Sequence, residues 1–295
     1  MRTYFDCVPC FVRQTLDSVR LITDDEQIHE QVMREALYQA CKMDLRQSPP
    51  AMAQKIHRII RKLTGVQDPY LKVKNHFNKL VLQMYPELKE RIEDSADPLE
   101  MAIRLAIAGN IIDLGVNAEL DESDVEKAIN ESLTGPLDTE SLEVFKDVIP
   151  QAEDILYLGD NAGEIVFDRL LIEQLPIEKV TVVVKGQPVI NDATMEDAII
   201  AGLPRIVEVI DNGSDAPGTI LKSCSRYFQD RFENADLVIA KGQGNYETLS
   251  DVEKNIFFIL KAKCSVIARD IGCKVGEMVF QQIKAFNGEK EDAKI

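Results

Sequence analysis

The sequence has little of what several common kinds of enzyme chemistry require. It contains no tryptophan and only three histidines, all of them before residue 80. Chemistry in the second half of the chain must therefore depend on carboxylates, amides, lysines or a metal ion rather than on histidine. No apolar run approaches the length of a membrane-spanning helix, and the N-terminus lacks the apolar region of a signal peptide. We expect a cytoplasmic protein with no membrane partner.

Positive charge is also scarce, since 34 lysines and arginines stand against 50 acidic residues and give a net charge of −16. Non-specific nucleic-acid binding needs clustered basic side chains, so we expect no nucleic-acid partner. The six cysteines do not form the pattern of a disulfide framework. The 295 residues, 45% of them apolar, suit one large domain or a core with a smaller accessory domain.

Several familiar motifs are missing. There is no G-x-x-x-x-G-K-[ST] of a phosphate-binding P-loop and no G-x-S-x-G of a hydrolase elbow. The stretch "GQGNYE" lacks the third glycine of a dinucleotide-binding fingerprint. A haloacid-dehalogenase nucleophile would have a second aspartate two residues after Asp160, where Ala162 stands instead.

The two halves of the chain differ in their pattern. Residues 1–148 have apolar residues at helical spacing, as in "AMAQKIHRIIRKL" and the very apolar "ADPLEMAIRLAIAGNIIDLG", which predicts a mainly helical N-terminal domain. In residues 149–295 amphipathic stretches alternate with short runs typical of buried parallel strands: "DILYLG", "KVTVVVK", "RIVEVI" and "ADLVIA". We also expect "IFFILKA" and "CSVIARDIG" to add strands. This alternation predicts an α/β fold, a doubly wound, Rossmann-like sheet between helices.

Each of the first four predicted strands is followed by a polar loop that contains glycine. The loops are "GDNAGE", "KGQPVINDATMED", "DNGSDAPG" and "KGQGNYE". The carboxyl ends of parallel strands lie at one edge of a sheet, so the four loops should converge on one crevice. A single loop of this kind is weak evidence, because aspartate and asparagine beside glycine are common turn and N-cap residues. Four such loops together favour a binding site.

The side chains of these loops suit a metal ion and a phosphate group. Asp160, Asn161 and Asp192 offer the oxygen ligands that Mg²⁺ or Mn²⁺ prefers. Lys185 and Lys241 could neutralise phosphate, and the loop glycines allow backbone N–H groups to approach an anion. The further candidates for substrate contact are Glu164, Asn191, Asp211, Asn212, Gly242, Gly244 and Asn245. A structural alternative stays open for two of these positions: Asn191 could cap the next helix, and Glu164 could favour a helix N-terminus.

Two other groups of polar residues are noteworthy. Cys7 and Cys10 form a C-x-x-C at the start of a predicted helix, which is either a pair of packed thiols or part of a metal site with a distant ligand. Arg104, Asn110 and Asp113 interrupt an apolar helix. Because buried polar groups need partners, we expect these three to contact one another or the crevice, mainly as packing support.

The motifs "DCVPCF", "AIAGNIIDLG", "LGDNAGEIVFD", "VKGQPVINDATMEDA", "DNGSDAPG" and "AKGQGNYE" together resemble the damage-control phosphatases. This family was long catalogued as domain of unknown function 89, and the C-x-x-C resembles its prokaryotic branch. The resemblance implies a helical N-terminal domain on a Rossmann-like domain. It also implies a phosphatase of small phosphorylated metabolites that depends on Mn²⁺, Mg²⁺, Co²⁺ or Ni²⁺. Carried onto this sequence, the metal ligands are Asp160, Asn161 and Asp192, and the substrate contacts are Lys241 and Glu164.

The resemblance leaves the attacking group open between water and a carboxylate. Two other functions are weighed against a phosphatase. One is a metabolite or nucleotide sensor without catalysis, and the other is a redox or metal-handling protein centred on Cys7 and Cys10. The density of carboxylates, amides and lysines in the four loops favours the phosphatase.

Overall fold

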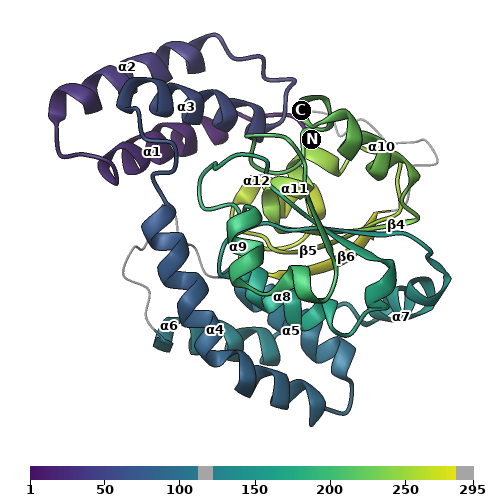
Figure 1. Ribbon diagram of the computed structural model, residues 1–295. Coiled ribbons are helices and arrows are strands. Elements are labelled where there is room, and N and C mark those ends of the chain that lie inside the picture. Colours follow the sequence, from purple (N-terminus) through teal and green to yellow (C-terminus); the bar gives the residue numbers. More distant parts are fainter. Residues whose placement is uncertain (112–121, 284–295) are drawn as a thin grey trace.

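A six-stranded sheet lies at the centre of the structure, a computed structural model that describes residues 1–111 and 122–283 (Figure 1). Its strand order is β3-β2-β1-β4-β5-β6, with β1 to β5 parallel and β6 antiparallel to β5. The strands are β1 (Ile155–Leu158), β2 (Val180–Val184), β3 (Glu208–Asp211), β4 (Leu237–Lys241), β5 (Ile256–Lys261) and β6 (Met278–Ile283). The chain order reverses between β1 and β4, as in Rossmann-like sheets. The predicted α/β fold class is confirmed.

Helices make up the described part of the first 148 residues, which contains no strand. They are α1 (Cys7–Arg20), α2 (Glu26–Cys41), α3 (Pro49–Thr64), α4 (Leu71–Glu93), α5 (Pro98–Ile111), α6 (Glu122–Thr134) and α7 (Thr139–Val148). The later helices are α8 (Glu164–Ile172), α9 (Met195–Ile200), α10 (Arg226–Asn234), α11 (Gly242–Leu249) and α12 (Ser265–Ile271). Helix α3 begins where the sequence indicates, with Ser48 as N-cap and proline at its first position. No helix in the described ranges is long and apolar enough to cross a bilayer.

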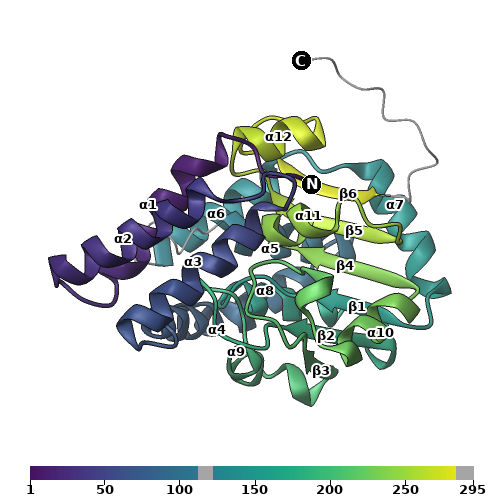
Figure 2. The same ribbon diagram turned by 90° about the horizontal axis from the view of Figure 1, so that it is seen from above.

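Helices cover both faces of the sheet and form three layers (Figure 2). Successive strand residues point to opposite faces, so Tyr157 packs in one core and Leu156 and Leu158 pack in the other. The first core joins the sheet to helices α4 to α9, and the second joins it to α10, α11 and α12. Burial on both faces explains why the central strands are continuous apolar runs.

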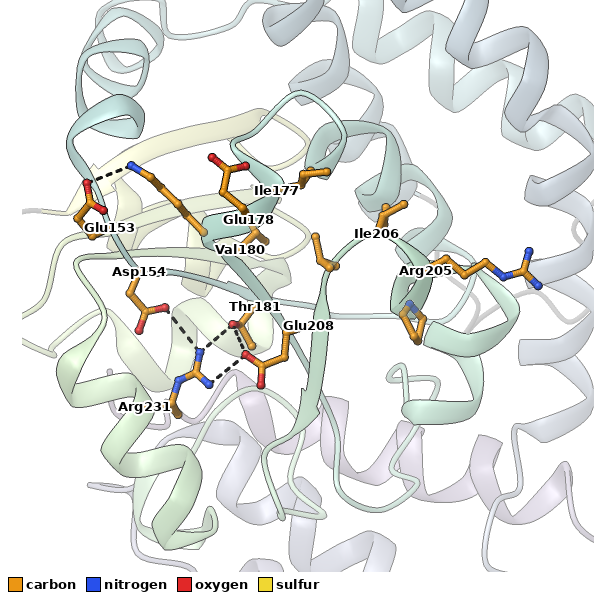
Figure 3. Close-up of a pocket in the computed structure, with 13 residues that line it drawn as sticks. Glu153, Asp154, Ile177, Glu178, Val180, Thr181, Arg205, Ile206, Glu208 and Arg231 are labelled. Atoms are coloured by element: carbon orange, nitrogen blue, oxygen red, sulfur yellow. Dashed lines mark hydrogen bonds and ion pairs between the residues drawn. The ribbon is translucent and has the colours of Figure 1, made fainter.

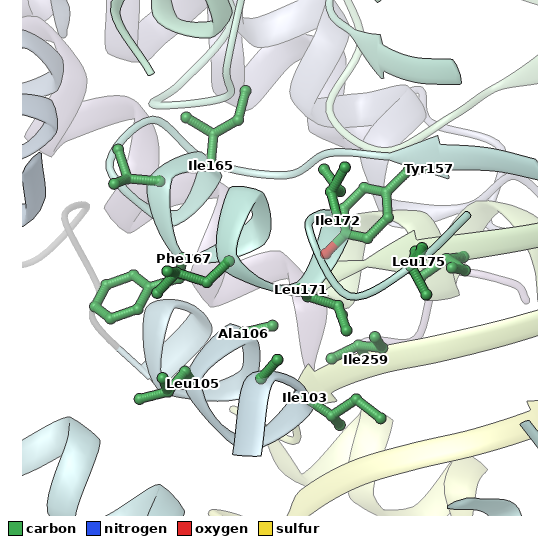
Figure 4. Close-up of a cluster of buried hydrophobic side chains, with 14 of the residues drawn as sticks. Ile103, Leu105, Ala106, Tyr157, Ile165, Phe167, Leu171, Ile172, Leu175 and Ile259 are labelled. Atoms are coloured by element: carbon green, nitrogen blue, oxygen red, sulfur yellow. The ribbon is translucent and has the colours of Figure 1, made fainter. Parts of the chain in front are cut away.

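Helix α5 lies in the first core, as its apolar sequence predicts. Ile103, Leu105 and Ala106 are fully buried and pack with Phe167 and Leu171 of α8 (Figure 4). The contact brings the end of α5 against the start of α8, directly behind the loop that follows β1. A helix of the first half of the chain thus forms part of the wall of the predicted crevice.

Helices α1, α2 and α3 have a small core of their own, which includes Phe11, Val32 and Ile56. Figure 2 shows these three helices grouped beside the sheet. Their contacts with the rest of the molecule include polar ones, such as the Arg61 guanidinium on the carbonyl of Pro188 and on the carboxylate of Asp215. Since Pro188 and Asp215 lie in the loops after β2 and β3, α3 rests on the carboxyl edge of the sheet. The division of the chain into domains 1–148 and 149–295 stays a prediction.

Two sequence-based expectations about the strands were wrong, and one strand was missed. The segment "CSVIARDIG" contains a helix, α12, because Ile267 and Ile271 lie four residues apart on one face and Gly272 ends the helix in a left-handed conformation. The sixth strand is instead β6, which the polar pair Gln281 and Gln282 concealed. Strand β3 is an edge strand that is not fully buried.

Candidate active site

The loops that follow β1 and β2 are joined by their backbones. Asn161 and Asp192 form an isolated antiparallel bridge. The N–H of Ala162 donates to the carbonyl of Asn191 at 2.9 Å, and the N–H of Ala193 donates to the carbonyl of Asp160 at 2.8 Å. The first two predicted loops are therefore one connected structure at the carboxyl edge of the sheet.

The side chains of this joined structure leave one buried oxygen atom without a hydrogen bond. Asp160 and Asp192 are 9% and 3% exposed, and Asp192 Oδ2 accepts no hydrogen bond although it lies 3.4 Å from Lys185 Nζ. Asn161 uses its amide nitrogen to donate to Asp160 Oδ2 and Glu164 Oε2, both at 2.9 Å. A buried acceptor that receives no hydrogen bond lowers the stability of the fold. The loops therefore resemble a set of ligands for a cation.

Asn110, at the end of α5, contacts the same cluster. Its amide nitrogen donates to Asp160 Oδ2 at 3.1 Å and to both carboxylate oxygens of Glu164 at 3.2 and 3.3 Å. Its Oδ1 accepts from the backbone N–H of Lys261 in β5 at 3.0 Å, which fixes the orientation of the amide. Of the residues that interrupt the apolar helix, Asn110 contacts the crevice. The Arg104 guanidinium is bound to Glu100 and to two backbone carbonyls, and Asp113 lies outside the described residues.

Lys241, at the end of β4, is completely buried and fully paired. Its ammonium group donates to Glu164 Oε1 at 2.7 Å, to Asp168 Oδ1 at 2.5 Å and to the carbonyl of Ala106 at 2.9 Å. A lysine has three N–H donors, so this side chain has none left for another group. Tyr157 adds a hydrogen bond from its hydroxyl to Asp168 Oδ1 at 2.9 Å.

The buried cluster has more negative than positive groups. It contains the carboxylates of Asp160, Glu164, Asp168 and Asp192 and the ammonium groups of Lys185 and Lys241. When all are ionised, two negative charges are in excess. Burial, together with the charges of Glu164 and Asp192, raises the pKa of Asp160 well above its usual range. Burial also raises the pKa of Asp168 to about 7 and that of Asp192 to about 6, against the opposing effect of the neighbouring lysines.

The donor set fits a hard divalent cation. Two carboxylates and a side-chain amide are the ligand types of Mg²⁺ and Mn²⁺, and a bound cation would favour the ionised form of both carboxylates. Among residues 1–111 and 122–283, no three His, Cys, Asp or Glu side chains converge as a metal-binding group. The predicted set differs from such a group, because its third member is the amide of Asn161.

Glycine is required where β4 leads into α11. Gly242 has φ +76°, and a Cβ there would lie 1.8 Å from Asp160 Oδ2. Asn245, one turn further, is fully buried and donates to the carbonyl of Gly159 at 3.3 Å and to that of Lys241 at 2.7 Å. Its Oδ1 accepts from the hydroxyl of Thr219, so Asn245 ties the fourth loop to the first and third.

The remaining candidate residues lie around this centre or outside it. Asn191 is buried, and the preceding Ile190 has φ 46°, a strained value for a β-branched residue. Asn212 is buried, and its Oδ1 accepts from the N–H groups of Gly186 and Ser214 as part of a turn. Gly244 packs closely against the backbone of Gly218. The structure does not bring Asp211 into the cluster, because its side chain is exposed and accepts from the N–H of Gly213.

The two cysteines of the C-x-x-C lie at the start of α1, with Cys7 half-buried and Cys10 exposed. Burial raises the pKa of both thiols, and the charge of Glu247 and the thiol of Cys264 act in the same direction. Neither thiol is therefore activated as a thiolate at neutral pH.

A separate depression of about 420 Å³ lies at the opposite edge of the sheet (Figure 3). It is lined by residues that precede or begin β1, β2 and β3, including Asp154, Lys179 and Glu208. Arg231 in this depression is paired with Asp154 and Glu208. None of the candidate site residues lines it, so it is not part of the joined loops.

Sequence reasoning missed Asp168 as a member of the buried cluster. A signal was present, because Asp168 follows Glu164 by four residues in an otherwise apolar helix, and this spacing places both carboxylates on one face. The hydroxyl of Tyr157 was missed as well, since nothing in the strand "ILYL" indicates its partner.

Comparison with known proteins identifies the family of the chain. The damage-control phosphatase ARMT1-like domain matches residues 3–279. A damage-control phosphatase of Archaeoglobus fulgidus is 37% identical over 94% of this chain and 98% of its own, and one of Pyrococcus horikoshii is 36% identical over 96% and 99%. The crystal structure of a DUF89 family protein from Pyrococcus horikoshii, 34% identical, superposes with a TM-score of 0.83 over 96% of this chain and 99% of that one. The chain belongs to the damage-control phosphatase ARMT1-like domain family.

Proposed function

We propose that this protein is a divalent-metal-dependent phosphatase that hydrolyses phosphomonoesters of small metabolites, such as sugar phosphates, in metabolite damage control. The observation that carries the proposal is the buried Asp192 carboxylate, whose Oδ2 accepts no hydrogen bond and has only the ion-pair contact with Lys185, in a cluster that also holds the Asp160 carboxylate. Membership of the phosphatase family supports the reaction class. We also place the protein in the cytoplasm as part of this proposal.

In this proposal Asp160, Asn161 and Asp192 hold the ion, which is Mn²⁺, Mg²⁺, Co²⁺ or Ni²⁺. A bound divalent ion would supply Lewis-acid polarisation of a phosphoryl oxygen. The side chain of Asn110 keeps the Asp160 carboxylate in place through its hydrogen bond to Oδ2. The Oδ1 of Asn161 would be the neutral ligand of the set, while its amide nitrogen donates to Asp160 and Glu164.

The two lysines have different roles in this proposal. Lys185 lies 3.4 Å from Asp192 and makes one further hydrogen bond, to the carbonyl of Gly218. It is the lysine suited to face a phosphate, because its donors are not all used. Lys241 instead compensates the charges of Glu164 and Asp168. Contact of Lys241 and Glu164 with substrate stays a prediction.

Hydrolysis requires that a new P–O bond forms to the attacking oxygen, that the ester P–O bond breaks and that the leaving alcohol takes up a proton. The carboxylates nearest the reaction are candidates for accepting the proton of an attacking water. Backbone N–H groups near Gly242 and Gly244, at the start of α11, lie where they could face phosphoryl oxygens. Substrate contacts of Asn191, Asp211, Asn212 and Asn245 stay predictions.

The test is release of inorganic phosphate by the purified full chain. After chelator treatment, the protein is supplied separately with Mg²⁺, Mn²⁺, Co²⁺ or Ni²⁺ and offered p-nitrophenyl phosphate and a panel of phosphorylated metabolites. We expect phosphate release that requires added metal and is lost in Asp192→Asn. If no metal supports phosphate release while a metabolite still raises the melting temperature, the protein is a sensor and the proposal is wrong.

A further inference from the structure

Asn78 lies on the buried face of α4, which packs against α8 and α9 behind the candidate site. The buried face contains four residues that are at most 1% exposed: Lys74, Phe77, Asn78 and Val81. Phe77 and Asn78 follow Lys74 by three and four residues and precede Val81 by four and three, so all four share one face of the helix. Two of these four residues are polar and completely buried. Buried polar groups are retained where their partners need them, so the contacts of Asn78 identify what it holds.

The amide of Asn78 joins two loops. Its Oδ1 accepts from the backbone N–H of Gly163 at 2.6 Å, and its Nδ2 donates to Asp197 Oδ1 at 2.8 Å. The two partners fix the orientation of the amide, because an N–H can only donate and a carboxylate oxygen accepts. Gly163 follows the predicted ligands Asp160 and Asn161, and Asp197 lies in the first turn of α9, the helix that follows Asp192.

The contact with the first loop is very close. Gly163 has φ +75°, and a Cβ at this position would lie 1.7 Å from Cδ1 of Phe77. Only glycine allows the loop to come this near to α4. The N–H of Gly163 therefore lies against the helix, where Asn78 accepts from it. The position of this loop depends on α4 as well as on β1.

The contact with the second loop runs through a helix cap. Asp197 Oδ2 accepts from the N–H and the hydroxyl of Thr194, both at 2.8 Å, and forms an ion pair with Lys74 Nζ at 2.9 Å. Thr194 stands two residues after Asp192 and pairs with Lys185 in an isolated parallel bridge. Asp197 thus holds the segment that carries Asp192, and Asn78 holds Asp197.

We propose that Asn78 is a positioning residue that sets the separation between the Asp160–Asn161 loop and the Asp192 loop. The inference rests on the proposed function, since it concerns the geometry of the proposed metal ligands. Asn78 has no role in binding the ion or the substrate. It acts from behind both loops, through Gly163 on one side and Asp197 on the other. Lys74 supports it by neutralising the Asp197 carboxylate.

The first test is Asn78→Leu, which keeps the branching and the number of heavy atoms of the side chain and removes both hydrogen bonds. Loss of a residue that orients metal ligands lowers metal affinity about 10–100-fold, and we expect the Kd for Mn²⁺ to rise by about that factor. The matched control is Tyr85→Phe, which removes a hydrogen bond from the same helix to Glu173, the C-cap residue of α8, away from both loops. Electron paramagnetic resonance of free Mn²⁺, measured well below each melting temperature, gives Kd. Wild-type affinity in folded Asn78→Leu overturns the inference, and so does an equal loss in Tyr85→Phe.

A rescue experiment separates positioning from general destabilisation. Asn78→Asp keeps an acceptor for Gly163 but places a carboxylate oxygen against Asp197. In the double variant Asn78→Asp/Asp197→Asn, the amide at position 197 can donate to the carboxylate at position 78, so the hydrogen bond between the two side chains is restored with its direction reversed. We expect weakened Mn²⁺ binding and a lowered kcat in the single variant and recovery of both in the double variant. Single and double variants that are equally impaired contradict the inference.

Hydrogen exchange distinguishes failure of this inference from failure of the proposed function. If the wild-type protein binds no Mn²⁺ and releases no phosphate, the proposed function is wrong, and exchange of the Gly163 and Thr194 amides still reports the link. We expect both amides to exchange faster in Asn78→Leu than in wild type or Tyr85→Phe. Unchanged protection of both amides refutes the positioning role, whatever the protein catalyses.

Discussion

Asn161 and Asp192 pair through their backbones although they belong to loops that follow different strands. The loops after neighbouring parallel strands usually lie side by side without such a bridge. Here two backbone hydrogen bonds, at 2.8 and 2.9 Å, form the bridge and join the two loops directly. The proposed ligands therefore belong to one rigid structure, so that substitutions at the site should change chemistry more than fold.

Removal of a proposed ligand charge should abolish activity and yet stabilise the metal-free protein. We expect Asp160→Asn to lower metal-dependent phosphatase activity by at least about 100-fold, at the upper end of effects seen for residues around metal sites. In chelator-treated protein the same variant should melt at a higher temperature than wild type, because a buried carboxylate no longer faces Glu164 and Asp192. Thermal unfolding with and without Mn²⁺ measures this. Asp230→Asn on α10 serves as the surface control, and a lower metal-free melting temperature in Asp160→Asn would contradict the expectation.

Lys241 and Lys185 should respond differently to removal of their charge. Lys241→Met leaves Glu164 and Asp168 buried without a cation, and we expect a loss of about 3–5 kcal/mol in the free energy of unfolding. Lys185→Met should lose less stability, bind divalent metal at least as tightly and lose phosphatase activity by about 100-fold. Urea unfolding, Mn²⁺ titration and phosphate release measure the three quantities. Equal stability losses in both variants would show that the assigned roles are wrong.

Gly242→Ala should displace the Asp160 carboxylate. Gly65 offers a matched control, because its φ of +75° is nearly that of Gly242 but a Cβ there meets nothing within 4 Å. We expect Gly65→Ala to cost about 1 kcal/mol, the usual penalty for a left-handed alanine. Gly242→Ala should cost a further 1–3 kcal/mol or so from overpacking and should also weaken Mn²⁺ binding. If the two variants behave alike in stability and metal binding, the close approach of Gly242 to Asp160 has no consequence.

His57 should make the protein sensitive to acid. It is 2% exposed with no partner for Nε2, and burial, with the charge of Arg61, lowers its pKa to about 3. Between about pH 6.5 and pH 3 the unfolded chain takes up a proton at this residue and the folded protein does not. Stability is therefore lost as the pH falls through this range, by up to about 1.4 kcal/mol per pH unit.

His57→Leu should remove this contribution. The difference in unfolding free energy between wild type and His57→Leu should be constant near pH 8 and should shift in favour of the variant below about pH 6. Urea unfolding of both proteins at a series of pH values measures the difference, and effects of the carboxylates cancel in the comparison. A difference that does not change with pH would mean that His57 takes up a proton in the folded protein as readily as in the unfolded chain.

Most of the sheet could be predicted because its central strands are buried on both faces. Such strands are continuous runs of Val, Ile and Leu, and the loops after them contain glycine and aspartate, so β1, β2, β4 and β5 are visible in the sequence. The local sequence pattern did not predict the C-terminal part of the sheet correctly. The short apolar segment of α12 resembles a strand, and β6 carries glutamines because it lies at an edge.

The candidate site could be predicted only in part, because its supporting residues are distant in the sequence. Residues in the loops that follow parallel strands are placed at one edge by topology, and this is the basis on which Asp160, Asn161 and Asp192 were predicted as ligands. Their supports come from far along the chain, since Asn110 contacts Asp160 across 50 residues and Asn78 contacts Gly163 across 85. A polar residue in an apolar helix indicates a need for a partner but does not identify the partner.

Strand β3 has a consequence for how this molecule behaves in a crowded solution. It is four residues long, stands at an open edge of the sheet, and carries exposed carboxylates at both ends, Glu208 and Asp211. An open edge offers unpaired N–H and C=O groups to a strand of another molecule, and a short, charged strand discourages such pairing. With the net charge of −16, which makes copies of the chain repel one another, β3 protects the protein against edge-to-edge aggregation.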